Sequence, residues 1–203
     1  GLLLNSQVFG KALSEVPAVC VYMRDGTQVT VPDFLVDICN LIRSHVTTEG
    51  IFRKAGSSQR QTDIKKIIDS GNPLPNTVHV IDAACLLKKY LQCLPEPFLT
   101  PEVFTLFVKC LNLNKDIQKY AFTLCTLLLP LPQRETLAYL MEFLGDVAAA
   151  SGHNLMDSHN LAIVLAPNLF PVTPPSTNHK ANQLSNNIQP GHYELTTTID
   201  VIK

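Results

Sequence analysis

Apolar residues recur every three or four positions along most of the chain, which is the period of amphipathic helices. The periodic segments begin at capping residues or proline and stop at glycine or proline, so the expected helices follow one another with short connections. We expect them from Pro32 to Val46, Ser58 to Gly71, Asp82 to Leu94, Thr100 onward, Asn114 to Leu129 and Pro132 to Val147. A further helix is expected from Asn160 to Leu165, closed by Pro167. The Phe, Met and Leu stripes after Asn114 are interpreted as core.

Local signals indicate where these helices start. The sequence Ser58-Gln59-Arg60-Gln61 has the form of a capping box, and Asp82 and Asp157 are candidate caps of later helices. Thr100-Pro101-Glu102 combines a cap, a proline at the first helical position and an acid in the first turn. His45 falls on the apolar arc of the first helix, so we interpret it as a core histidine rather than a ligand.

The chain divides into four parts by composition. Residues 1–30 are mixed, with the turn Arg24-Asp25-Gly26-Thr27 between β-prone runs, and predict an N-terminal strap with a short hairpin. Residues 31–170 form the helical core, residues 171–192 are rich in Pro, Thr, Ser and Asn and indicate a flexible loop, and residues 193–203 are expected to form a last helix that docks back. The predicted fold class is a single compact all-α domain.

Composition limits the class of protein further. The 203 residues are 46% hydrophobic and only 16% charged, which favours one tightly packed body, and no apolar run is long enough to span a membrane. Six cysteines occur without a C-x-x-C pair, and the histidines do not lie near them at zinc-finger spacing. We therefore expect free thiols in a reducing, cytoplasmic setting rather than the alternative of a disulfide scaffold, and no metal site.

Charge is distributed unevenly. Between Arg53 and Lys89 there are seven basic and three acidic residues, a net charge of +4, whereas the remainder carries nine basic and fourteen acidic residues, a net charge of −5. A basic face on a nearly neutral body favours an acidic or phosphate-bearing partner. Nucleic acid is not expected, because no aromatic-basic interleaving or groove-binding motif accompanies the charge.

The stretch from Thr48 to Ser57 is the main candidate for chemistry. Gly50 and Gly56 bracket Ile51 and Phe52, then Arg53 and Lys54, so an always-charged guanidinium suited to phosphate lies on a constrained loop. The alternative is a connecting loop with a solvated Arg-Lys pair. No phosphate loop ending in Gly-Lys-Ser/Thr and no other enzyme motif occurs, so we find no self-contained active site.

Four stretches together resemble the Rho GTPase-activating (RhoGAP) domain family, over about residues 9–170. The first is the arginine loop Thr48–Ser57. The others follow in the family's order, as Leu86-Leu87-Lys88-Lys89-Tyr90-Leu91-Gln92-Cys93-Leu94-Pro95-Glu96-Pro97, Met156-Asp157-Ser158-His159-Asn160-Leu161-Ala162 and Ala166-Pro167-Asn168-Leu169. The resemblance implies a RhoGAP-like helical fold and a Rho, Rac or related small GTPase as partner, with no membrane insertion.

The resemblance also implies roles for particular residues. Arg53 matches the arginine finger, a catalytic group supplied in trans to a GTPase that brings its own GTP and Mg²⁺, so the domain needs no cofactor of its own. Residues matched to GTPase binding or support of the loop are Lys54, Lys88, Gln92, Pro97 and Asn168.

Gln92 departs from the family pattern, which usually has arginine at that position. A second hypothesis therefore stays open, in which the fold binds a GTPase or another partner as a scaffold and accelerates hydrolysis weakly or not at all. The alternative interpretation of Lys88 and Gln92 is that they lie on a solvated helix face without a functional role.

Overall fold

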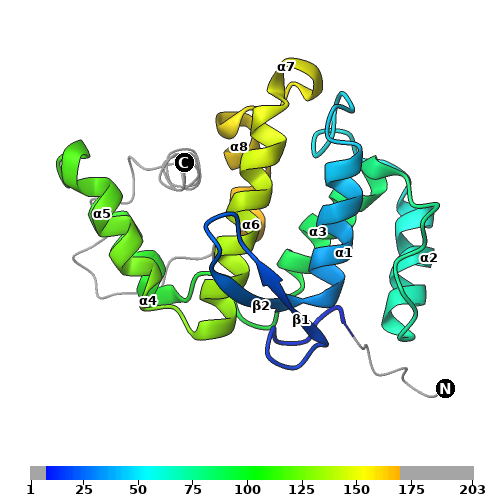
Figure 1. Ribbon diagram of the computed structural model, residues 1–203, viewed down its shortest axis with the longest axis horizontal. Helices are drawn as coiled ribbons and strands as arrows, with labels where there is room; N and C mark the ends of the chain where they lie inside the picture. Colours follow the sequence, from blue (N-terminus) through cyan, green and yellow to red (C-terminus); the bar gives the residue numbers. More distant parts are fainter. Residues whose placement is uncertain (1–7, 170–203) are drawn as a thin grey trace, which may run out of the picture.

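The computed structural model describes residues 8–169, and the elements in this range are helical apart from one hairpin (Figure 1). In chain order they are β1 (Ala18–Tyr22), β2 (Gln28–Pro32), α1 (Asp33–Ser44), α2 (Ser58–Asp69), α3 (Val80–Gln92), α4 (Pro101–Cys110), α5 (Lys115–Thr126), α6 (Leu131–Ala149), α7 (Ser151–Asn154) and α8 (Ser158–Leu169). The predicted all-α class is confirmed. The loop predicted at 171–192 and the helix predicted at 193–203 lie outside the described residues.

The helices form a central body with α4 and α5 on one side and α2 on the other (Figure 1). Helix α1 packs against α3, α3 against α8, and α6 against α8, whereas α4 pairs with α5 and α2 packs against α3. The loop between α1 and α2 lies at the same end of the body as α7 (Figure 1). Helix α3 thus packs against α1 and α8 of the central body and also against α2.

The N-terminal segment contains the expected hairpin. Strands β1 and β2 are antiparallel with Cys20 opposite Thr30, and Gly26 in the turn has φ +85°, a left-handed conformation that glycine adopts readily. The Thr30 backbone N–H donates to Glu135 of α6 at 3.1 Å, and the Arg24 backbone N–H donates to Glu142 at 3.0 Å. The hairpin therefore lies across α6.

Aromatic rings pack against one another at several places in the described core. Phe9, Phe34 and Tyr90 join the N-terminal segment to α1 and α3, with ring centroids 5.2–5.7 Å apart. Further ring pairs are Phe52 with Phe143 and Phe107 with Phe122. The predicted apolar stripe of α6 is buried, as Leu137, Leu140, Met141, Leu144 and Val147. The stripe predicted for α5 is partly wrong, because Phe122 is buried but Leu124 is 64% exposed.

Several helix boundaries agree with the predicted caps. The side chains of Thr100 and Asn114 accept bonds from the first turns of α4 and α5, and Asp157 accepts a bond from the Asn160 N–H at 2.8 Å. The predicted stop at Pro167 is wrong, since α8 continues to Leu169 with Pro167 inside it. Asn168 donates its side-chain amide to the Val164 carbonyl at 3.0 Å, which supplies a donor in the turn that the proline weakens.

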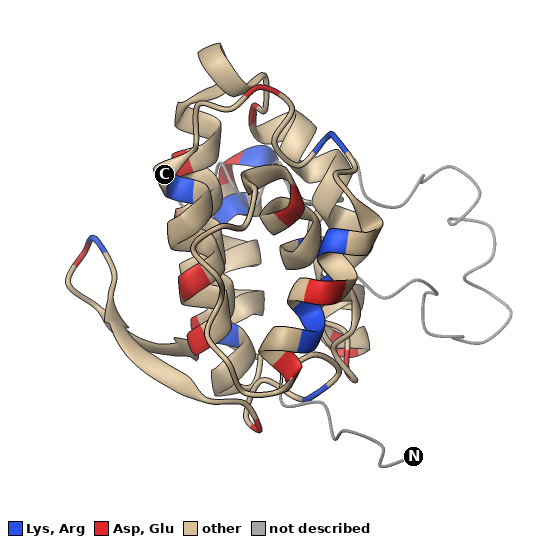
Figure 2. Cartoon of the chain, turned by 90° about the vertical axis from the view of Figure 1, so that its right-hand side faces the viewer, with Lys and Arg blue, Asp and Glu red and all other residues tan. Residues whose placement is uncertain are grey.

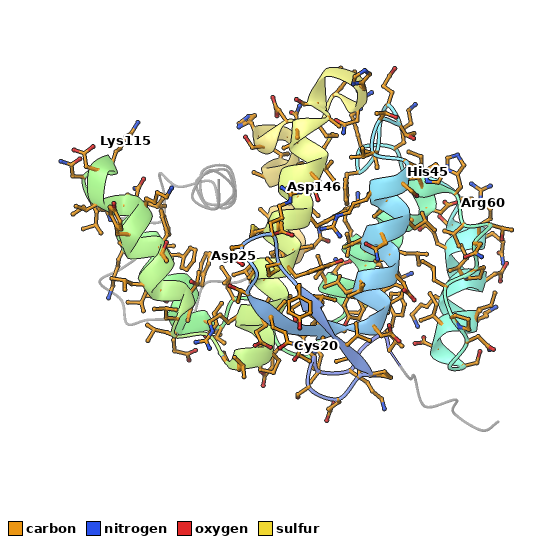
Figure 3. The ribbon with its side chains drawn as sticks, viewed as in Figure 1. Cys20, Asp25, His45, Arg60, Lys115 and Asp146 are labelled. Atoms are coloured by element: carbon orange, nitrogen blue, oxygen red, sulfur yellow. The ribbon has the colours of Figure 1, made fainter. Side chains whose placement is uncertain are left out.

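Two further expectations are corrected at the ends of α1 and α2. Helix α2 starts one residue early, because Ser57 is the cap and accepts from the Arg60 N–H at 3.4 Å, so Ser58 to Gln61 is not a capping box. His45 is not a core residue. It is exposed at the end of α1 (Figure 3), where Nδ1 lies 3.1 Å from the Leu41 carbonyl. The apolar arc continues past the last helical turn, so the period alone misplaced this side chain.

Candidate functional site

The arginine loop, residues 48–57, connects α1 to α2 and has a buried base. Ile51 and Phe52 are 0% exposed, and the Phe52 ring packs against Phe143 at 6.4 Å between centroids. Gly50 and Phe52 both have positive φ, +83° and +62°, which is rare for a bulky residue such as phenylalanine. The loop thus buries Ile51 and Phe52 and turns sharply just before Arg53.

Arg53 itself faces solvent. Its side chain is 60% exposed, and its only ion pair in the described part of the chain is with Glu49, at 3.8 Å. Glu49 is equally exposed, so this pair contributes little and leaves the guanidinium able to reorient. The backbone is ordered instead, because the N–H groups of Arg53 and Lys54 both donate to the Gly50 carbonyl, at 3.1 and 2.9 Å.

One face of α3 runs along the arginine loop in the opposite direction. Asp82 accepts from the Ser57 N–H at 2.7 Å, Cys85 donates to the Ala55 carbonyl at 3.1 Å, and Lys88 donates to the Phe52 carbonyl at 2.8 Å; these three residues of α3 form the α3 row. Residues three apart share a helix face, which is why the three contacts follow in order. Burial raises the pKa of the Cys85 thiol, so the sulfur keeps its proton and remains a donor.

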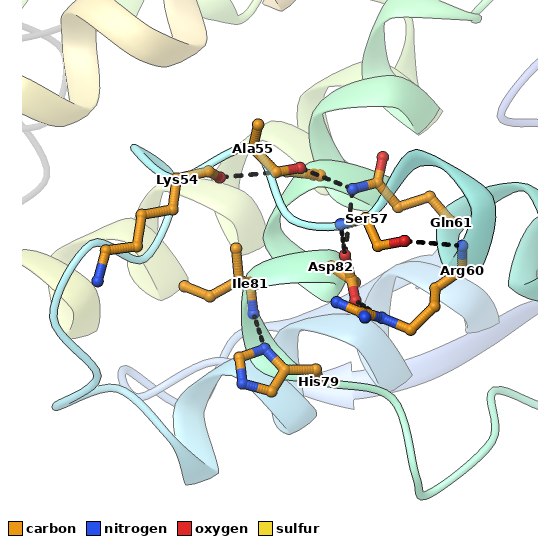
Figure 4. A network of polar contacts seen from close by, with 9 residues as sticks. Lys54, Ala55, Ser57, Arg60, Gln61, His79, Ile81 and Asp82 are labelled. Carbon is orange, nitrogen blue, oxygen red and sulfur yellow. Dashed lines mark hydrogen bonds and ion pairs between the residues drawn. The ribbon is translucent and has the colours of Figure 1, made fainter.

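Asp82 is the residue that the sequence interpretation misassigned. It was expected to cap α3, but His79 is the cap, accepting from the Ile81 N–H at 3.2 Å, and Asp82 lies in the first turn with 0% exposure. Its carboxylate also accepts from Arg60 Nε at 2.6 Å and from Gln61 Nε2 at 3.2 Å (Figure 4). A lone acid inside an apolar run was the available signal that it needed a buried partner.

The charge state of Asp82 follows from these partners. Burial alone would raise the pKa of its carboxyl, but the hydrogen bonds from Ser57, Arg60 and Gln61 outweigh burial and lower the pKa below its ordinary value of 3.8. Asp82 is therefore an anion at neutral pH, and three donors hold it in place.

The N-terminal part of the arginine loop is held by a second buried polar residue, Asn154, which the sequence analysis does not identify. The side-chain amide of Asn154 donates to the carbonyls of Val46 and Val147 at 2.8 and 2.9 Å. The main-chain carbonyl of Asn154 accepts from the Gly50 N–H at 3.4 Å. Asn154 is 0% exposed. These bonds join the end of α1, the start of the loop and the end of α6.

The other predicted site residues lie in two places. Lys54 and Lys88 belong to the arginine loop and the α3 row, and Gln92 is exposed one helical turn beyond Lys88, at the end of α3. Pro97 lies in the connection after α3, which is tied to the end of α8 by a 3.3 Å bond from the Leu99 N–H to the Leu169 carbonyl, next to Asn168. Within residues 8–169 no hydrogen bond or ion pair joins Pro97 or Asn168 to the arginine loop.

Ion pairing concentrates the positive charge at the site. Every acid between residues 53 and 89 pairs with a basic residue of the same stretch, as Asp63–Lys66, Asp69–Lys65 and Asp82–Arg60. Figure 2 accordingly shows blue and red residues alternating along a helix at the front. The basic residues that have no acidic partner within this stretch, and that carry its net charge of +4, are Arg53, Lys54, Lys88 and Lys89; Arg53 pairs with Glu49, outside the stretch.

Residues 8–169 contain neither a membrane-spanning helix nor a cluster of metal ligands. Within residues 8–169 no helix is both long and apolar enough to cross a bilayer. Nor does this part of the chain gather three or more His, Cys, Asp or Glu side chains in an arrangement that could hold a metal ion.

The described residues thus form a helical domain with an exposed arginine on a loop that α3 holds by hydrogen bonds. Residues 32–174 match the RhoGAP domain family, and the chain belongs to this family. It is 35% identical over 169 residues to human Rho GTPase-activating protein 11A, which covers 82% of the chain but 16% of that relative. It is 32% identical over 173 residues to human Rho GTPase-activating protein 1, covering 82% of the chain and 38% of the relative. The chain thus spans well under half of these two relatives.

Solved structures support the same fold. The crystal structure of human Rho GTPase activating protein 15 aligns with a TM-score of 0.76 at 21% identity, covering 99% of this chain and 90% of that one. The BH domain from GRAF, the GTPase regulator associated with focal adhesion kinase, aligns with a TM-score of 0.63 at 20% identity, covering 84% of this chain and 90% of that one. At these identities the likeness is one of fold.

Proposed function

We propose that this domain accelerates GTP hydrolysis by a Rho-family small GTPase, with Arg53 inserted into the partner's nucleotide site. The observation that carries the proposal is the position of Arg53. Its side chain is exposed, and the residue immediately before it, Phe52, is held by a hydrogen bond from Lys88 to its carbonyl. A cation on an ordered loop enters a partner's site at a lower entropic cost than one on a loose loop. Membership of the RhoGAP family supports the choice of partner.

The role of Arg53 is electrostatic. Phosphoryl transfer spreads negative charge over the transferred oxygens, and a guanidinium placed there stabilises the transition state more than the ground state. An arginine finger in the related Ras system is worth about 10³ to 10⁵ in rate, which is roughly 4 to 7 kcal/mol of barrier. The partner supplies the GTP, the Mg²⁺ and the residue that orients water, so the domain acts as an activator rather than as an enzyme with its own substrate site.

The remaining site residues have supporting roles in this proposal. Lys88 fixes the loop, and the charge of Lys54 and Lys89 attracts the acidic, phosphate-bearing partner. Pro97 lies in the connection after α3 and Asn168 near the end of α8, two segments that the bond from the Leu99 N–H to the Leu169 carbonyl joins, and both residues would contact the partner there. The setting we propose is the reducing cytoplasm, since the six cysteines are free thiols.

A second candidate function is a binding or scaffold module without strong acceleration. Gln92 favours it, because this exposed side chain carries no charge at a position where the family usually has arginine. This module would bind a GTPase or another partner. Where the partner is a GTPase, the two candidates make the same complex and differ in the rate of hydrolysis within it.

Single-turnover GTP hydrolysis against a panel of Rho, Rac and related GTPases separates them. We expect wild type to accelerate at least one GTPase, Arg53→Ala to remove the acceleration while binding to the GTP-loaded form stays within about tenfold, and Arg53→Lys to lose most of it because lysine lacks the planar fork. Lys54→Ala is the control for loss of a neighbouring charge, and should weaken association without removing the maximal rate. Binding without acceleration by wild type would favour the scaffold.

A further inference from the structure

Asp82 joins three segments through one buried carboxylate. Its Oδ1 accepts from the Ser57 N–H at the end of the arginine loop and from Gln61 Nε2, and its Oδ2 accepts from Arg60 Nε (Figure 4). Asp82 is 0% exposed whereas Arg60 is 60% exposed, so the guanidinium covers the carboxylate from the solvent side. A buried carboxylate is tolerated only when paired and hydrogen-bonded in this way.

The backbone of the loop passes directly over this carboxylate. A Cβ added to Gly56 would lie 2.2 Å from Asp82 Oδ1, so only glycine fits there, and its φ of +65° is left-handed as well. Gln61 Nε2 also donates to the Ala55 carbonyl at 2.8 Å, and one amide thereby links the loop to the carboxylate. Three consecutive loop residues, 55 to 57, are held by contacts that meet at Asp82.

The location of these contacts distinguishes Asp82 from an ordinary core residue. Every polar partner of its side chain, namely Ser57, Arg60 and Gln61, lies within eight residues of Arg53. On the other side of Arg53, the Phe52 carbonyl is held by Lys88. Only residues 53 and 54 lie between the two fixed points, and releasing either one would lengthen the free segment that carries the guanidinium.

We propose that Asp82 is a positioning residue for Arg53. The Asp82–Arg60 pair fixes the end of the arginine loop, and this holds in place the Arg53 backbone from which the guanidinium extends. The inference rests on the proposed function of Arg53 as an arginine finger. A displacement of about 1 Å in a catalytic group can cost about 100-fold in rate, so loss of this fixed point reduces the rate of the chemical step more than binding.

The test uses two variants at this pair and a matched control. Asp82→Asn keeps an acceptor for the Ser57 N–H but turns an amide N–H₂ toward Arg60, and Arg60→Gln removes the cation but keeps an amide that can donate to the carboxylate. Asp69→Asn is the control, since Asp69 likewise accepts from a backbone N–H, that of Phe9 at 3.0 Å, and pairs with a cation, Lys65. It lies at the far end of α2, about 16 Å from Ser58 at 1.5 Å per residue.

Three quantities are measured for each protein at a temperature where circular dichroism shows it folded. They are the saturating single-turnover rate on the most responsive GTPase, the affinity for that GTPase loaded with a non-hydrolysable GTP analogue, and amide hydrogen exchange of residues 50–57. We expect Asp82→Asn to lower the saturating rate by about 10- to 100-fold and Arg60→Gln to lower it in the same direction. Affinity for the analogue complex should stay within about threefold, and exchange of the loop should become faster.

The outcomes separate this inference from the function on which it rests. If Asp69→Asn slows hydrolysis as much as Asp82→Asn, or if neither Asp82→Asn nor Arg60→Gln changes the rate or the exchange of residues 50–57, the positioning role is overturned. If wild type accelerates no GTPase in the panel, the proposed function itself fails. Faster loop exchange in Asp82→Asn, but not in Asp69→Asn, supports the fixed point in either case.

Discussion

Lys88 Nζ donates a 2.8 Å hydrogen bond to the carbonyl oxygen of Phe52, the residue immediately before Arg53. The ring of Phe52 is fully buried. Its φ is positive, which is a backbone conformation that phenylalanine seldom adopts. The bond to Lys88 satisfies that carbonyl, and it holds the loop at the point where the chain turns outward.

Replacing Lys88 should therefore affect hydrolysis more than binding. We expect Lys88→Met, which keeps the length of the side chain without its charge, to lower the saturating single-turnover rate by about 10- to 100-fold through displacement of Arg53. Lys89→Met removes a neighbouring exposed charge and is the control. Equal rates for the two variants would mean that the Phe52 carbonyl does not need its donor.

Gly56 and Gly71 offer a matched pair for the contact with Asp82. Both have positive φ, +65° and +83°, but a Cβ at Gly71 meets nothing within 4 Å whereas one at Gly56 meets Asp82. We expect Gly71→Ala to lower the free energy of unfolding by about 1 kcal/mol from the left-handed backbone alone, and Gly56→Ala to lower it by at least about 1 kcal/mol more. Urea unfolding of both variants measures the difference, and equal losses would argue against a close approach at Gly56.

Substitution of Gln92 tests whether the arginine that the family usually has at this position is needed for stimulated GTP hydrolysis. Gln92 is exposed, four residues after Lys88, so Gln92→Arg adds a fork of donors on the same side of α3 without disturbing the core. We expect stimulated GTP hydrolysis to rise and the melting temperature to change little. Gln92→Lys, which adds charge without the fork, is the control. An unchanged or lower rate for Gln92→Arg would mean that activity does not depend on this position.

The excess charge should act on encounter more than on chemistry. Arg53, Lys54, Lys88 and Lys89 are screened over a Debye length of about 8 to 10 Å at physiological salt. We expect the association rate with a GTPase to fall as ionic strength rises from about 0.01 to 0.15 M, while the hydrolysis rate within the complex changes much less. Stopped-flow association and single-turnover rates measure the two, and equal salt sensitivity would contradict steering.

Asp82 should also make the free energy of unfolding depend on pH in the acidic range. Its folded pKa lies below the ordinary value of 3.8, so as pH falls through that range the unfolded chain takes up the proton first and the folded state is destabilised. The contribution is fully present above about pH 5 and is lost as pH falls through the folded pKa. Urea unfolding between pH 2.5 and 6 (about one measurement per half unit) should give a steeper loss for wild type than for Asp82→Asn.

The sequence predicted the helices well because their signals are local. The caps at Thr100 and Asn114 and the buried face of α6 depend on residues within one or two turns, and the structure has them where the pattern indicated. The arginine loop was also recognisable, since its two glycines and buried pair lie within ten residues.

The misassigned residues have partners elsewhere in the chain or lie where a period ends. Asp82 is a residue type that commonly caps helices, and the sequence places it near the start of α3. It is buried because the arginine loop and α2 pack against it, which no local pattern shows. Asn154 is an isolated polar residue whose bonds to Val46 and Val147 no spacing reveals. At His45 the helical period was extended past the last turn, where the side chain faces solvent.

The α3 row and Gln61 hold the arginine loop mainly through its main chain, at the Phe52 and Ala55 carbonyls and the Ser57 N–H. Main-chain groups are the same whichever side chain the residue carries, so we expect the exposed positions Lys54 and Ala55 to accept many residue types without moving Arg53. A library randomised at these two positions would therefore vary the surface next to the guanidinium while keeping its location. Selection among GTPases could proceed at Lys54 and Ala55 with the placement of Arg53 unchanged.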